Sequence, residues 1–319
     1  MLTQNDRIAG GIWGAVVADA LGVPVEFSSR EERRRDPVTG VRGYGTYNQP
    51  PGTWSDDSSM LLCTVEHLYD EYDAAALGTL FVNWCFHGYC TPWGETFDRG
   101  NATTKALSRI NRGTPAEEAG GTDEGSNGNG SLMRILPVAL RFTGAPADTL
   151  LDIAHRISGI THRHPRAQMA CGVYCLLARE LLAGQSAGDA YRRAMAAADA
   201  CYVDEPFQNE RLHFVRLFSG KIGEESERNI NSGGYVMDTL EAALWCLLTT
   251  DNYADAVLKA INLGGDTDTT ACVTGGLAGV LYGPAAIPPE WQEALAKGEM
   301  VSELIRSFML TPRCGVIAD

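Results

Sequence analysis

The chain has 319 residues, of which 45% are hydrophobic and 21% are charged, and its formal net charge at pH 7 is −14. This composition is typical of a soluble globular protein with a sizeable core. The charge argues against binding to nucleic acid or an anionic membrane, because phosphate contacts need an excess of lysine and arginine. The N-terminal residues have no basic stretch followed by an apolar run, so we expect no signal peptide. We also expect no membrane span, because no apolar run approaches the ~20 residues that one needs.

The nine cysteines are odd in number, form no CxxC pair and lie mostly within apolar runs. Such a pattern favours reduced, buried thiols over a disulfide framework, so we expect a cytoplasmic protein.

Apolar residues recur at helical spacing along nearly the whole chain, and no convincing run of alternating β-branched residues occurs. The pattern predicts an all-α fold of roughly a dozen helices. Because no Pro/Ser-rich linker and no fixed repeat is present, we expect one compact multi-helix domain over residues 1–319.

The first predicted helix starts near Ile8 and ends at Gly22 and Pro24, since glycine and proline terminate helices. Glu26 then lies just past the end of this helix. A lone glutamate after a proline is usually solvated, so spacing alone does not favour a function for it.

Three glycine-rich stretches, 28–55, 113–130 and 219–236, read as long loops. Structureless loops of this length in a compact domain are usually functional or disordered, and their place beside the acidic motifs favours function.

Two short acidic clusters lie more than two hundred residues apart, and each opens a predicted buried helix. They consist of Ser55, Asp56 and Asp57 in the first cluster and of Asp266, Asp268 and Thr269 in the second. Helix capping is the simple alternative, because aspartate, serine and threonine accept hydrogen bonds from the free N–H groups of a first turn. One cap needs one acceptor, however, and the clusters hold far more carboxylate than that.

Four carboxylates brought together would carry about four negative charges, which two divalent cations would balance. A ligand set made only of oxygen favours Mg²⁺ or Mn²⁺ over zinc. The sequence therefore predicts a two-metal site, and such a site is usually catalytic.

Three further motifs are each ambiguous. The stretch 128–134 is a glycine loop that we expect to run into a helix, where free N–H groups could hold an anion, or else an ordinary turn. His162 lies in an HxH motif, but no third histidine or cysteine stands at a suitable spacing for a metal, which leaves a hydrogen-bonding role or a plain loop. Tyr235 precedes an amphipathic helix and could anchor the core or stack on a planar ring.

The helix after the second cluster carries Gly275, Gly279 and Gly283 at a spacing of four. This face has almost no side chains, so we expect another helix to pack closely against it within the core.

Taken in order, seven segments resemble the ADP-ribosylglycohydrolase family, with the dinitrogenase reductase-activating glycohydrolase branch as the best match. The segments are residues 14–26, 52–57, 97–101, 128–137, 161–165, 231–245 and 264–270. Most are weak alone, but seven in the family's order are highly specific, and they span nearly the whole chain.

The resemblance implies an all-α fold with a central binuclear Mg²⁺ or Mn²⁺ cleft. The implied metal ligands are Ser55, Asp56, Asp57, Asp266, Asp268 and Thr269. Glu26 matches a glutamate near the scissile bond, and Asp98 matches an aspartate close to the distal ribose. The implied contacts to phosphate, ribose or adenine are Gly128, Asn129, Gly130, Ser131, His162 and Tyr235. Ala18 replaces the commoner glycine before Asp19. The resemblance gives this position no ligand role, so we expect the replacement to be harmless.

The function that follows is removal of ADP-ribose from a modified protein side chain, with arginine expected from the branch. Either Glu26 or Asp98 would act as acid or base. Serine-linked or O-acyl ADP-ribose is an alternative substrate. A protein that only binds ADP-ribose, or that neutralises a toxin by occlusion, is a further alternative. ADP-ribosylated protein and ADP-ribose are the expected partners, and the oligomeric state stays open, with a monomer as one option.

Overall fold

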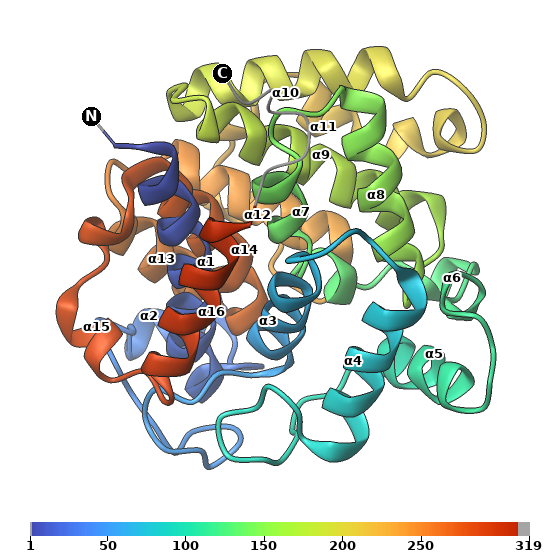
Figure 1. The fold of residues 1–319 in the computed structure, drawn as a ribbon. Coiled ribbons are helices and arrows are strands. Elements are labelled where there is room, and N and C mark those ends of the chain that lie inside the picture. Colours follow the sequence, from blue (N-terminus) through green and yellow to red (C-terminus); the bar gives the residue numbers. More distant parts are fainter. Residues whose placement is uncertain (1, 312–319) are drawn as a thin grey trace.

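The computed structural model describes residues 2–311, and these form sixteen α-helices and seven 3-10 helices without any strand (Figure 1). The α-helices are α1 (Gln4–Gly22), α2 (Arg30–Arg35), α3 (Asp56–His67), α4 (Ala74–His87), α5 (Asn101–Asn111), α6 (Ala116–Ala119), α7 (Leu136–Arg141), α8 (Ala147–Gly159), α9 (Pro165–Leu182), α10 (Ala187–Cys201), α11 (Val215–Phe218), α12 (Val236–Leu248), α13 (Tyr253–Asn262), α14 (Thr267–Tyr282), α15 (Pro289–Glu293) and α16 (Gly298–Leu310). The 3-10 helices are η1 (Val23–Val25), η2 (Glu124–Ser126), η3 (Asn129–Ser131), η4 (Phe207–Phe214), η5 (Ile222–Glu224), η6 (Glu227–Asn229) and η7 (Pro284–Ala286).

The all-α expectation is confirmed, although the helices outnumber the predicted dozen. The excess lies in α2, α6, α11 and α15, which are each six residues long or shorter. Helices of this length complete fewer than two turns, so their apolar residues establish no period in the sequence. For the same reason the stretches 28–55, 113–130 and 219–236 are less structureless than expected, since each contains at least one short helix.

Helices α1 and α14 pack against each other at the centre of the fold (Figure 1). The contact is made through glycines, because a Cβ atom on Gly279 would lie 2.6 Å from the carbonyl carbon of Gly10. One on Gly14 would lie 3.1 Å from the Cα atom of Gly279. The backbones therefore touch, which confirms the close packing expected of the glycine face.

The segment Gln4–Val25 is long and apolar enough to cross a membrane by length and composition alone, so the expectation that no run comes near this size was wrong. Of the apolar window, 83% is buried inside the protein, mainly where α1 packs against α14. The core helix of a globular protein passes the same test, and the packing of α1 accounts for its hydropathy.

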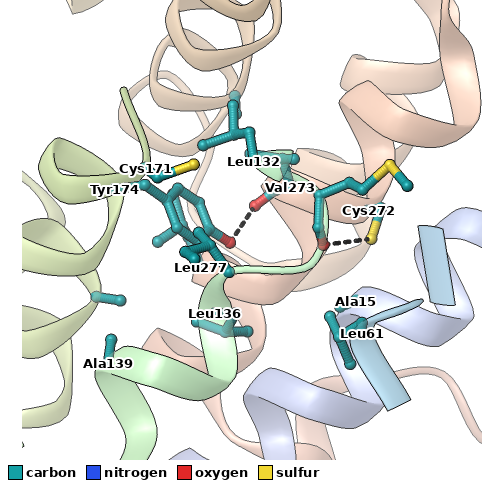
Figure 2. Close-up of a cluster of buried hydrophobic side chains, with 14 of the residues drawn as sticks. Ala15, Leu61, Leu132, Leu136, Ala139, Cys171, Tyr174, Cys272, Val273 and Leu277 are labelled. Carbon is teal, nitrogen blue, oxygen red and sulfur yellow. Dashed lines mark hydrogen bonds between the residues drawn. The ribbon is translucent and has the colours of Figure 1, made fainter. Parts of the chain in front are cut away.

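A second part of the core joins α7, α9 and α14 (Figure 2). The buried ring of Tyr174 lies among apolar side chains that include Leu132, Leu136 and Leu277, and its hydroxyl donates to the carbonyl of Val273 at 3.0 Å. This packing ties α14 to the segment 128–134, so two motifs far apart in sequence are held by one rigid cluster.

The eight described cysteines are free thiols, and six of them are buried. Cys314, the ninth, lies outside the described residues.

Candidate metal and substrate site

The two acidic clusters meet at the N-termini of α3 and α14. Ser55 is the N-cap of α3, and Asp266 is the N-cap of α14. The Thr269 hydroxyl donates to Oδ2 of Asp57 at 3.2 Å, although the two residues are 212 positions apart. Ser55 Oγ contacts the same carboxylate oxygen at 3.2 Å. The structure therefore brings both clusters to one place.

Glu26 joins the clusters from the end of η1. One carboxylate oxygen from each of Glu26, Asp266 and Asp268 lies within 4.8 Å of the others, a spacing at which one metal ion could contact all three. Glu26, expected beside the scissile bond, is thus also placed as a possible metal ligand.

Four carboxylate oxygens of this group are buried without any hydrogen-bond donor. They belong to Glu26 (Oε2), Asp57 (Oδ1), Asp266 (Oδ1) and Asp268 (Oδ2). Burial of an unpaired carboxylate is costly unless a cation compensates it. The pKa values of Asp56, Asp57 and Asp268 are raised well above the usual range, first by burial and then by the negative charge of neighbouring carboxylates. A hard divalent cation would relieve both effects, so the residues present fit a metal.

Asp19 supports this site, although the sequence interpretation gave it no role. Its buried carboxylate accepts hydrogen bonds from the Ser55 N–H at 3.1 Å, the Ser55 hydroxyl at 2.8 Å and the Ser58 N–H at 3.0 Å, and also from the Ser58 hydroxyl. It thereby fixes the first turn of α3 to α1. The available signal was a lone aspartate within the apolar run of α1, which is unexpected unless it is fully paired.

A cavity of about 290 Å³ opens beside the carboxylates. Of the residues singled out from the sequence, its wall contains Glu26, Asp56, Asp98, Gly128, Asn129, Gly130, His162, Asp266 and Thr269. Burial, together with the charges of Asp98 and Asp266, raises the pKa of Glu26 to about 9. Glu26 and Asp98 interact directly, and both also interact with the hydroxyl of Tyr47.

The glycine loop reaches the second acidic cluster through Asn129. The side-chain amide of Asn129 donates to Asp266 Oδ2 and to the Thr239 hydroxyl, both at 2.9 Å. The stretch 128–134 runs into a helix as expected: it contains η3, and α7 begins at Leu136. Ser131 is fully buried, where it bonds Ser158 and contacts Cys171, so it does not line the cavity.

His162 lines the cavity, and its Nδ1 atom lies 2.8 Å from the Thr161 hydroxyl. Burial and the nearby Arg134 guanidinium lower its pKa to about 3, which leaves the ring neutral. Arg134, itself buried, donates to the carbonyl of Gly130 at 2.7 Å and so supports the loop from behind. Tyr235 does not line the cavity. Its ring lies 6.0 Å from the guanidinium carbon of Arg166, and a guanidinium N–H of Arg166 donates to the Tyr235 hydroxyl at 3.2 Å.

Comparison with known proteins agrees with this geometry. The model of the ADP-ribosylglycohydrolase family matches residues 1–315. The chain belongs to the ADP-ribosylglycohydrolase family. An ADP-ribosylarginine hydrolase Tri1 of Pseudomonas putida is 33% identical over 307 residues, which cover 95% of this chain and 78% of that protein. The ADP-ribosyl-[dinitrogen reductase] glycohydrolase of Rhodospirillum rubrum is 30% identical over 91% of this chain and 90% of its own length.

The fold is shared with a solved structure described as an ADP-ribosylglycohydrolase-related protein complex. The TM-score is 0.79 at 32% identity, with coverage of 97% of this chain and 98% of that one. The resemblance to the ADP-ribosylglycohydrolase family that the sequence indicated is therefore confirmed over nearly the whole chain.

Proposed function

We propose that this protein hydrolyses the bond between ADP-ribose and an arginine side chain of a modified protein. The contact between Thr269 and Asp57 carries the proposal, because it unites the two acidic clusters next to a cavity lined by Glu26 and Asp98. The relatives named as ADP-ribosylarginine hydrolases support arginine as the acceptor.

Two Mg²⁺ or Mn²⁺ ions are the proposed cofactors, held by Ser55, Asp56, Asp57, Asp266, Asp268 and Thr269. The charge of these four carboxylates supports two divalent ions over one. The unpaired oxygens of Asp57, Asp266 and Asp268 support a bound cation. When bound, such ions would orient the ribose hydroxyls and position the attacking water.

The chain's own residues supply the rest of the chemistry. Cleavage at the anomeric carbon passes through an oxocarbenium-like state, and the pair Glu26 and Asp98 moves the protons of the water and the leaving group. The loop 128–131 holds the diphosphate, with Asn129 kept in place by Asp266 and Thr239. His162 contacts the ribose or phosphates, and Tyr235 stacks on adenine; because Tyr235 does not line the cavity, the adenine must extend beyond it.

We further propose a cytoplasmic location and a single domain over residues 1–319. The free thiols support a reducing compartment. One continuous cluster of buried residues from α1 to α16 supports the single domain.

The direct test is release of ADP-ribose from an ADP-ribosylarginine peptide, before and after treatment with EDTA and after re-addition of Mn²⁺ or Mg²⁺. We expect EDTA to abolish turnover and the metal to restore it. Undiminished turnover in EDTA would refute the metal site. An absence of turnover with metal, while a serine-linked peptide is cleaved, would refute arginine as the acceptor.

A further inference from the structure

Phe27 is unusual in both exposure and backbone conformation. Its side chain is 68% exposed, and its φ angle of 62° lies in the left-handed region. A bulky residue other than glycine is strained in this region, and such strain is often kept at functional sites. The backbone N–H of Phe27 donates to the carbonyl of Gly265 at 2.7 Å, which holds the residue beside the acidic cluster of α14.

Phe27 begins a row of aromatic side chains, here called the aromatic wall, which consists of Phe27, Tyr47 and Phe97. The rings of Phe27 and Tyr47 meet edge to face with centroids 6.5 Å apart, and those of Tyr47 and Phe97 lie 5.1 Å apart. Phe27 directly follows Glu26, and Phe97 directly precedes Asp98. The aromatic wall therefore stands beside the two carboxyl groups proposed to move protons.

The position of Phe27 separates two cavities. Its side chain lines the site cavity and also a neighbouring cavity of about 480 Å³. The second cavity includes Ser29, Asn231 and Gly233 but no residue of the loop 128–131 that is proposed to hold ADP-ribose. An acceptor side chain that enters from the second cavity would pass over the ring of Phe27 to reach Glu26.

We propose that Phe27 determines specificity for arginine by stacking on the guanidinium group of the acceptor. A guanidinium group is planar and cationic, so it binds favourably to the face of an aromatic ring, particularly beside carboxylates. A serine acceptor offers neither a charge nor a plane. This inference rests on the proposed function, and it adds a recognition element for the leaving group.

The test compares Phe27→Leu, Phe27→Tyr and Tyr44→Leu in the Mn²⁺-loaded protein. Tyr44 is a matched control because it is 63% exposed, has a φ angle of 65° and does not line the site cavity. For an ADP-ribosylarginine peptide, we expect Phe27→Leu to lower kcat/KM about fivefold, mainly through KM, because it removes the aromatic face. Phe27→Tyr keeps that face and should stay within about twofold of wild type. Tyr44→Leu should leave kcat/KM unchanged.

Calorimetric titration with free ADP-ribose, which has no guanidinium group, supplies the second readout. We expect all three variants to bind it as wild type does. Wild-type kcat/KM in Phe27→Leu, or a loss in Phe27→Tyr equal to that in Phe27→Leu, would overturn the inference. A weaker affinity of Phe27→Leu for free ADP-ribose would also overturn it, since the ring would then contact the nucleotide. Failure of the wild type on the arginine peptide would refute the proposed function itself and is thus distinguishable.

Discussion

Replacement of Gly279 by alanine tests the central helix crossing. The new Cβ atom would lie 2.6 Å from the carbonyl carbon of Gly10 and 3.2 Å from the Cα atom of Gly11, whereas ordinary contacts of a Cβ atom begin near 3.4 Å. The obstacle is backbone, which no rotamer change can move away. Helices α1 and α14 must therefore separate by about 1 Å along a packed interface.

Overpacking of this kind costs about 3 kcal/mol, at the upper end of the usual range, because both partners are rigid helices. Since a protein of this size has an unfolding entropy of about 0.7 kcal/mol/K, the melting temperature should fall by about 4–5 °C. The N-terminus of α14 carries Asp266, Asp268 and Thr269, so the same shift should weaken Mn²⁺ binding.

The assay is thermal and urea unfolding followed by circular dichroism, with Gly188→Ala as the matched control. Gly188 lies in the first turn of α10, and a Cβ atom there would meet nothing within 4 Å. The same chemical change should therefore stabilise the protein by about 0.5 kcal/mol, because alanine loses less backbone entropy. A Gly279→Ala protein within about 0.5 kcal/mol of wild type would refute the close crossing.

Three other changes test the site and its surroundings. Asp19→Asn should lower the free energy of unfolding by about 2–4 kcal/mol in urea, because two N–H groups and two hydroxyls lose a charged acceptor. Asp57→Asn should stabilise the metal-free protein by removing a buried like charge, yet reduce the rise in melting temperature caused by Mn²⁺. His155 packs on Tyr202 and Phe207, and burial lowers its pKa to about 4, below its ordinary 6.5. The unfolded chain therefore takes up the proton first as pH falls, and wild type should lose about 1–2 kcal/mol between pH 7 and pH 5 that His155→Gln does not lose.

Each of these three predictions would be contradicted by a specific result. Unchanged stability in Asp19→Asn would mean that Asp19 does not anchor α3. An Mn²⁺-induced shift in Asp57→Asn equal to that of wild type would remove Asp57 from the ligand set. Parallel pH curves for wild type and His155→Gln would show that the ring takes up its proton while the protein is folded.

The features that the sequence determined alone are local in origin. Helical periodicity depends on side chains three or four positions apart, and hydrophobic spacing over a few turns reveals it. The glycine spacing of α14 indicated a close helix contact for the same reason. Very short helices such as α2 were not predicted, because a helix of fewer than two turns establishes no period in the sequence.

Only the tertiary structure decided which of these local features meet. The bond from Thr269 to Asp57, the anchoring of Ser55 by Asp19 and the exposure of Phe27 all depend on how segments far apart in the chain pack together. Ser131 and Tyr235 matched their motifs, yet neither lines the cavity. In the folded chain Ser131 bonds Ser158, and Tyr235 bonds Arg166. Local pattern establishes what each segment becomes, whereas contacts across two hundred residues depend on the packing of the whole core.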